Sequence, residues 1–167
     1  MLQAKIDSAT LPFRVVNAGL SGETSAGALR RTDWILRGPV DVFVLETGAN
    51  DGLRGLDPDS MRANIEGILA KVKAARPDAR LCVVQMEAPP NLGARYVARF
   101  HAAYEAAAKA EGATLLPFLL DGVAGHPGLN QADGIHPNAA GARLVAATEW
   151  RALEPVLRSV DGSARAM

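Results

Sequence analysis

The spacing of hydrophobic residues along the chain predicts strands that alternate with helices. Short runs with β-branched or aromatic residues are typical of buried strands, and they lie at 14–18, 40–45, 81–86 and 114–118. Longer stretches with apolar residues at every third or fourth position predict helices, which lie at 2–9, 24–36, 58–76, 92–112 and 137–157. This alternation predicts right-handed βαβ units and an α/β fold with a parallel sheet covered on both faces.

Polar segments that contain glycine or proline follow the predicted strands. They lie at 19–25, 47–52, 87–91 and, after a long loop, 133–138. In a parallel sheet the ligand crevice lies outside the carboxyl ends of the strands. We therefore expect these four loops to converge on one rim.

The last of these loops contains a candidate general base. In Asp133-Gly134-Ile135-His136-Pro137-Asn138 the acid precedes the histidine by three positions, and glycine permits a tight turn between them. The carboxylate of Asp133 can then bind one imidazole nitrogen of His136 and fix its tautomer, which leaves the other nitrogen to accept a proton. The alternative is that Asp133 caps the following helix and His136 is a polar surface residue.

Two further loops contain candidate oxyanion donors. Gly22 presents a backbone N–H after the first predicted strand, and Asn50 presents a side-chain amide after the second. One backbone N–H and one amide aimed at a developing alkoxide form an oxyanion hole for acyl transfer. The alternative is that both are turn residues, because Gly and Asn are frequent in turns for conformational reasons.

Composition excludes several classes of protein. The chain of 167 residues, taken as a single domain over 1–167, has 18 basic and 18 acidic residues, which argues against a nucleic-acid surface. A single cysteine, Cys82, excludes an internal disulfide. No apolar run reaches the ~20 residues of a membrane span, and the N-terminus lacks the apolar core of a signal peptide.

Three blocks of the sequence resemble the SGNH (GDSL-type) hydrolases: 17–24, 46–55 and 133–138. Residues 89–93, with Tyr96 and Phe100, resemble the arylesterase and acyl-thioesterase/lysophospholipase branch of that family. The resemblance runs from about residue 2 to residue 157. It implies a three-layer, flavodoxin-like fold that hydrolyses small acyl esters or thioesters without a cofactor.

By position, the resemblance makes Gly22 and Asn50 the oxyanion donors, His136 the general base and Asp133 the residue that orients it. Thr47 stands where many members of the family have glycine.

The main departure from the family concerns the nucleophile. The family's serine belongs to a Gly-Asp-Ser block well upstream of the block at 17–24, and only sixteen residues precede Asn17. None of the six serines lies in a G-x-S-x-G elbow, and Asp7-Ser8 lacks the preceding glycine. Ser21 and Ser25 are the candidate substitutes. We expect these 167 residues to hydrolyse esters weakly or not at all.

The missing block includes the first, central strand of the family's sheet. Such a strand buries about four large side chains, or ~6–12 kcal/mol, so an empty slot is not expected. Three outcomes remain: the chain is truncated at its N-terminus, strands 14–18 and 40–45 pair directly, or a second copy closes the gap and forms a homo-oligomer. The sequence leaves localisation open: we expect a cytoplasmic protein from the sequence as it stands, and a periplasmic or secreted one if a signal peptide and nucleophile block lie upstream.

Two rival functions come from other classes. One is a non-catalytic, flavodoxin-like binding domain that holds a small anionic ligand at residues 21–25 and the helix that follows. The other is a metal site at His126, Asp133 and His136. For His101, in the middle of a predicted helix, a surface role is expected.

Overall fold

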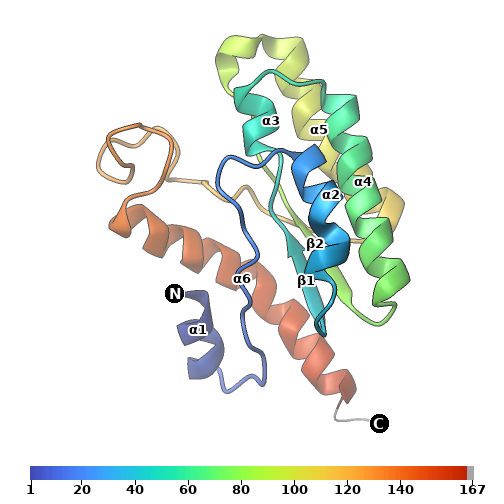
Figure 1. The fold of residues 1–167 in the computed structure, drawn as a ribbon. Helices are drawn as coiled ribbons and strands as arrows, with labels where there is room; N and C mark the ends of the chain where they lie inside the picture. The colour runs from blue at the N-terminus through green and yellow to red at the C-terminus, as the bar shows by residue number, and fades with distance from the viewer. Residues whose placement is uncertain (165–167) are drawn as a thin grey trace. The chain divides into compact units, whose positions relative to one another are not determined.

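The computed structural model describes residues 1–164, and these fall into two compact bodies (Figure 1). Residues 18–116 form one body, and residues 1–17 together with the chain from Pro117 onwards form the other. Each body is described by itself below.

The body of residues 18–116 is built on a parallel sheet. Its strands are β1 (Val42–Leu45), β2 (Arg80–Val84) and β3 (Thr114–Leu116), in the order β1-β2-β3. Val42 lies opposite Arg80, and Val84 lies opposite Leu116. Residues 81–84 of the central strand are buried on both faces, as expected for a parallel sheet in an α/β protein. The prediction of an α/β fold with parallel strands is therefore confirmed.

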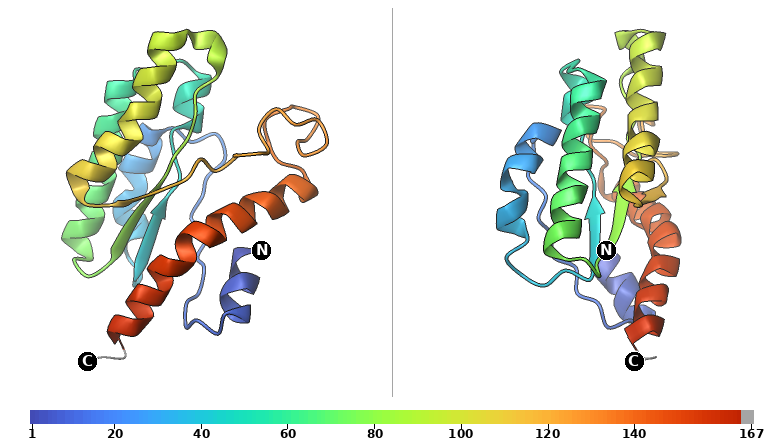
Figure 2. Two further views of the ribbon diagram at one scale, coloured as in Figure 1. Left: turned by 180° about the vertical axis from the view of Figure 1, so that it is seen from behind. Right: turned by 90° about the vertical axis from the view of Figure 1, so that its right-hand side faces the viewer.

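Five helices belong to this body, and the three long ones pack side by side (Figures 1 and 2). The five are α2 (Ser25–Ile35), α3 (Ala49–Leu53), α4 (Pro58–Ala75), the short 3₁₀ helix η1 (Pro90–Leu92) and α5 (Ala94–Glu111). Helix α4 lies between α2 and α5 and contacts both. Gly22 lies just before the first residue of α2, and Asn50 lies in the first turn of α3.

The sequence of α4 explains why it is the central helix of the layer. The side chain of Asp57 accepts the backbone N–H of Ser60 at 3.1 Å, and Pro58 occupies the first turn, where no N–H donor is required. Apolar residues at helical spacing then face the core: Met61, Ile65, Ile68, Leu69 and Val72 are all buried. The stripe lies within the helix that the sequence predicts from apolar residues at every third or fourth position.

Aromatic residues of α5 support the turn after β1. Phe100 and Tyr104 are fully buried, with ring centroids 5.6 Å apart. The hydroxyl of Tyr104 donates a hydrogen bond of 2.9 Å to the carbonyl oxygen of Thr47. Gly48 has a positive φ of 97°, and a Cβ atom there would collide with the Tyr104 hydroxyl. The side chain of Tyr104 therefore packs against Gly48 and stabilises the turn that leads to Asn50.

The second body contains the two terminal helices, α1 (Leu2–Ser8) and α6 (Ala139–Ala164), which contact each other. Asn138 caps α6, because its side-chain oxygen accepts the backbone N–H groups of Ala140 at 2.8 Å and Gly141 at 3.1 Å. The helix continues through Pro155, beyond its predicted end at residue 157.

The prediction of a strand at 14–18 is wrong. These residues form no strand, and the side chain of Gln3 accepts the N–H of Val15 at 2.7 Å. Val16 remains 74% exposed. A strand exists only through hydrogen bonds to a neighbour, and β1 is paired with β2 alone in the described sheet. Direct pairing of 14–18 with 40–45, one of the three expected outcomes, is therefore not formed.

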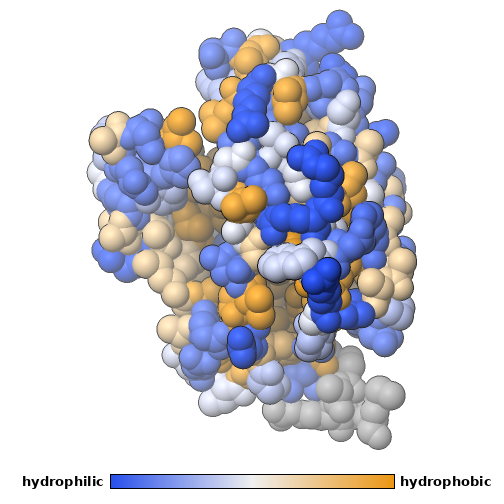
Figure 3. Space-filling model, viewed as in Figure 1, coloured by the Kyte–Doolittle hydropathy of each residue, from blue (hydrophilic) through white to orange (hydrophobic). Residues whose placement is uncertain are grey.

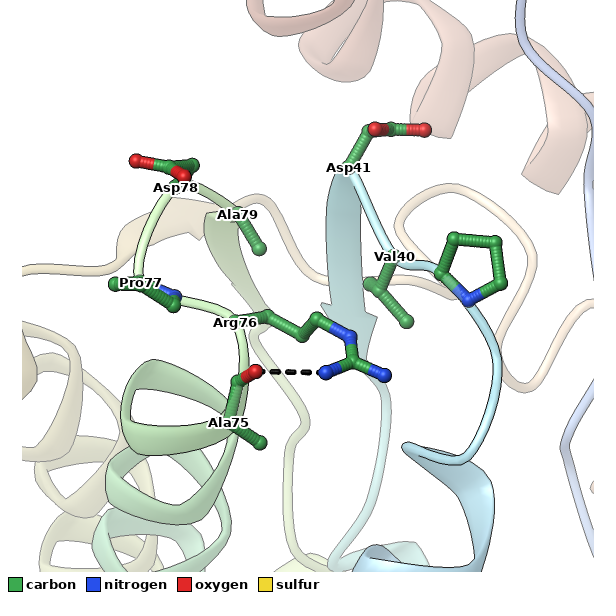
Figure 4. Close-up of a pocket in the computed structure, with 8 residues that line it drawn as sticks. Val40, Asp41, Ala75, Arg76, Pro77, Asp78 and Ala79 are labelled. Atoms are coloured by element: carbon green, nitrogen blue, oxygen red, sulfur yellow. Dashed lines mark hydrogen bonds between the residues drawn. The ribbon is translucent and has the colours of Figure 1, made fainter.

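A hollow of about 400 Å³ lies at the amino ends of β1 and β2, at the opposite end of the sheet from the Asn50 turn (Figure 4). The guanidinium of Arg76 donates hydrogen bonds to the backbone carbonyl oxygens of Ala75 at 2.7 Å, Leu36 at 2.6 Å and Gly38 at 2.9 Å. Arg76 therefore links the end of α4 to the loop that follows α2, which is a structural role.

Hydrophilic side chains predominate on the surface over α2 and α4, with apolar ones scattered among them (Figure 3). Among residues 1–164, none of the helices combines the length and the apolar character that a membrane span requires.

Candidate functional site

The turn at 133–138 brings Asp133 and His136 into contact. Oδ1 of Asp133 accepts the backbone N–H groups of Ile135 at 2.9 Å and His136 at 3.0 Å, and Oδ2 lies 2.8 Å from Nδ1 of His136. Gly134, with φ of 71°, supplies the left-handed residue of the turn. One carboxylate oxygen thus shapes the loop while the other holds the imidazole ring.

This geometry separates the two interpretations of Asp133. The cap of α6 is Asn138, so Asp133 does not cap the helix. With Nδ1 bound to the carboxylate as a donor, Nε2 of His136 is the ring nitrogen that can accept a proton, and no partner for it is recorded among the described residues. The side chain of His136 is 65% exposed, so the ring is accessible to a reactant.

The hydrogen bonds of this turn lower the pKa of Asp133 to about 2, first through the backbone N–H of His136, then through its ring and through the N–H of Ile135. An ordinary Asp has a pKa near 3.9, so the ionised carboxylate favours the turn at every pH above ~4 and this contribution is lost as the pH falls through 2. We expect the carboxyl carbon signal of Asp133 to titrate with a midpoint near 2 in an NMR titration. A midpoint near 4, or the same titration in Asp133→Asn, would contradict this.

Gly22 and Asn50 belong to the other body. Gly22 has φ of 77° and is exposed, and a Cβ atom there would meet nothing within 4 Å. Asn50 is half-buried in the first turn of α3. The guanidinium of Arg54, at the end of α3, donates a 3.0 Å hydrogen bond to the carbonyl of Gly22. The two segments are therefore neighbours within this body, whereas a single cleft shared with His136 stays a prediction.

A buried polar cluster behind these two segments was not predicted. Ser25 is 0% exposed and Asp51 is 2% exposed. The two oxygens of Asp51 accept the backbone N–H of Ser25 at 2.8 Å and its hydroxyl at 2.6 Å. Asn64 of α4 donates to the same Ser25 hydroxyl at 3.0 Å. Burial and these bonds make Ser25 a structural residue, which removes one of the two serines considered as substitute nucleophiles.

The same cluster bears on the anion-binding alternative. A phosphate at the start of α2 would use the free N–H groups and the positive end of the helix dipole. The carboxylate of Asp51 already occupies this position, and Glu23 beside it forms a two-pronged ion pair with Arg31 at 2.7 Å. The N-terminus of α2 therefore already binds a carboxylate of the protein, that of Asp51.

A second acid–histidine pair lies on α5 and the loop after β2. Nδ1 of His101 is 2.6 Å from Oε1 of Glu87, and both residues line an open, largely apolar hollow of about 580 Å³. His101 is at the surface, as the sequence predicts; its partner Glu87 was missed because fourteen positions separate them.

Within residues 1–164, no three His, Cys, Asp or Glu side chains gather in a way that could hold a metal ion. The structure therefore offers no support for a metal site at His126, Asp133 and His136.

Parallel strands linked by helices, together with a histidine oriented by an aspartate in the loop before the last helix, are features of an α/β ester hydrolase. Residues 1–144 match the GDSL-like lipase/acylhydrolase family. The chain belongs to this family, the SGNH (GDSL-type) hydrolases that the sequence resembles.

Known relatives agree with this assignment. Esterase TesA of Pseudomonas aeruginosa is 39% identical over 158 residues, which cover 94% of this chain and 78% of the relative. Thioesterase 1/protease 1/lysophospholipase L1 of Escherichia coli is 39% identical over 144 residues, which cover 86% and 68%. The crystal structure of the psychrotrophic esterase EstA from Pseudoalteromonas sp. superposes with a TM-score of 0.87 at 34% identity, covering 94% of this chain and 85% of that one. The predicted SGNH fold class is confirmed.

Proposed function

We propose that this domain carries the base and the oxyanion donors of a hydrolase of small carboxylic esters or thioesters, with His136 as general base, Asp133 as its orienting acid, and Gly22 and Asn50 as oxyanion donors. The observation that carries the proposal is the Asp133–His136 contact of 2.8 Å, which fixes the ring so that Nε2 accepts a proton. Family membership and the names of the relatives, an esterase and a thioesterase/lysophospholipase, support the reaction class.

In the proposed reaction a serine hydroxyl attacks the acyl carbonyl carbon, and its proton passes to Nε2 of His136. The carbonyl oxygen gains negative charge in the tetrahedral intermediate and accepts hydrogen bonds from the Gly22 N–H and the Asn50 amide. The intermediate collapses as His136 gives the proton to the departing alcohol or thiol. Water then attacks the acyl carbon of the acyl-serine while His136 takes its proton, and the acyl–serine bond breaks as His136 returns that proton to the serine oxygen, which releases the acid.

We further propose that these 167 residues alone support little turnover, because they contain no Gly-Asp-Ser block. The hydroxyl of Ser8 donates to the carbonyl of Ala4 within α1 at 2.8 Å, and that of Ser25 is buried. Oriented base and oxyanion donors without the nucleophile give a small part of the acceleration of an intact triad.

Binding of ethylphosphonate, a tetrahedral anion resembling the intermediate, tests the site without requiring turnover. We expect saturable NMR shifts of the Gly22 N–H, the Asn50 side-chain amide and the His136 ring, all with one dissociation constant, because the proposed roles require one bound anion to affect all three groups. His136→Ala should weaken binding and His126→Ala, which removes an exposed histidine, should not. Shifts that miss Gly22 and Asn50, or that give unrelated constants for His136, would contradict the proposed function.

The same variants test the proposal on turnover. With p-nitrophenyl acetate we expect the chain to differ little from buffer. Robust hydrolysis that His136→Ala abolishes and His126→Ala retains would overturn the proposed low turnover, and it would point to one of the serines in these residues as the nucleophile of the proposed reaction.

A further inference from the structure

The buried carboxylate of Asp51 lies between the two segments that carry the proposed oxyanion donors. On one side, Asp51 directly follows Asn50 in the first turn of α3. On the other, it binds the N–H and the hydroxyl of Ser25, the first residue of α2, three positions after Gly22. One side chain therefore links the start of α2 to the start of α3.

We infer that Asp51 is a positioning residue that sets the placement of the Gly22 N–H relative to the Asn50 amide. This inference rests on the proposed function, because it assigns Asp51 a role through the two oxyanion donors. Such donors stabilise an oxyanion only when both are held in place before the charge develops.

Burial makes this link strong. Ser25 and Asp51 are almost completely removed from water, so each bond between them acts in a medium of low dielectric constant and the loss of either partner leaves a buried polar group unpaired. The positive end of the α2 dipole also favours a carboxylate at this position. Asn64 of α4, a third helix, donates a hydrogen bond to the Ser25 hydroxyl, so Ser25 and Asp51 are also fixed relative to α4.

A second link between the same segments provides an internal comparison. Arg54 donates to the carbonyl of Gly22 at 3.0 Å, but this contact is exposed. Exposed contacts of a charged side chain are weak in water. If placement of the donors depends on Asp51, removal of Arg54 has a much smaller effect than removal of the Asp51 carboxylate.

Amide NMR without ligand tests the inference independently of any activity. In Asp51→Asn, and in Ser25→Ala, which removes the hydroxyl but keeps the backbone N–H, we expect the signals of the Gly22 N–H and the Asn50 side-chain amide to shift together. Arg54→Ala should affect Gly22 alone, and Asp78→Asn, which neutralises an exposed acid of the same body, should affect neither. The inference is wrong if Asp51→Asn and Ser25→Ala leave both Gly22 and Asn50 unchanged.

Ethylphosphonate affinity gives the readout that a merely structural role would not change. We expect Asp51→Asn to weaken binding by about tenfold at a temperature well below its melting point, because misplaced donors lose much of their effect. Ile65→Val serves as the control: it lowers the stability of the same body by trimming a buried side chain and should leave affinity unchanged.

The outcomes separate the two proposals. If the unmodified chain does not bind ethylphosphonate through Gly22 and Asn50, the proposed function fails, while the ligand-free spectra still decide whether Asp51 positions the donors. If the chain binds and Asp51→Asn binds equally well, or if affinity simply follows melting temperature through Ile65→Val, the positioning role is overturned and the proposed function stands.

Discussion

Replacing Gly48 with alanine is expected to lower the free energy of unfolding by about 2–5 kcal/mol. A non-glycine residue with a left-handed backbone costs ~1–2 kcal/mol, and overpacking a filled core costs a further ~1–3 kcal/mol. Both apply here, because φ is 97° and the new methyl group would meet the Tyr104 hydroxyl and lie 2.8 Å from the sulfur of Met61. The hydroxyl cannot move aside without breaking its bond to the Thr47 carbonyl.

Urea denaturation measures this effect against Gly112→Ala. Gly112 also has a positive φ, of 70°, but a Cβ atom there meets open space, so only the backbone strain remains. Adding Tyr104→Phe to Gly48→Ala removes the colliding oxygen and should recover part of the loss, a non-additivity expected for residues in contact. Equal destabilisation by Gly48→Ala and Gly112→Ala would show that the Tyr104 contact does not constrain the turn.

Replacing Phe100 with alanine is expected to cost about 3–5 kcal/mol, the usual range for a large buried aromatic residue. Phe100 is 0% exposed, and its ring is so close to Gly52 that an added Cβ atom would lie 3.2 Å from it. The cavity would therefore open directly beneath α3. We expect faster hydrogen exchange of the Gly52 N–H, which bonds the Gly48 carbonyl at 2.9 Å, in addition to the loss of stability.

Trp34→Ala is the control, because Trp34 is as large but 61% exposed, and surface substitutions usually change stability by ~0.5 kcal/mol or less. If Phe100→Ala does not fold, Phe100→Leu removes less volume and shows the same trend at smaller size. A cost for Phe100 no greater than that for Trp34 would contradict the expectation.

Hydrophobic spacing alone was sufficient to predict the elements whose burial is local and periodic. The stripe from Met61 to Val72 predicts α4, and the apolar run from residue 81 predicts β2. Element ends depend on caps and neighbours instead. Helix α6 begins at Ala139 because Asn138 takes the cap, and it continues past Pro155 although proline removes a backbone donor, since Leu153 and Leu157 on either side are both buried.

Two features could not be read from local patterns. The residues around Val15 have strand character, but a strand forms only where another strand supplies partners, and sequence spacing does not reveal that supply. The Ser25–Asp51–Asn64 cluster joins residues 26 and 39 positions apart, so no motif indicates it. By contrast, Asp133 and His136 are three positions apart, and their contact was predictable from the turn between them.

Acidic residues bracket the strand at the margin of the sheet. β1 is hydrogen-bonded to β2 alone in the sheet of residues 18–116, and exposed Asp41 and Glu46 stand immediately before and after it. If two copies paired these strands antiparallel over their full length, Asp41 of each copy would face Glu46 of the other. Like charges opposed in this way disfavour the pairing, and protonation of the two carboxylates at acid pH would remove this repulsion.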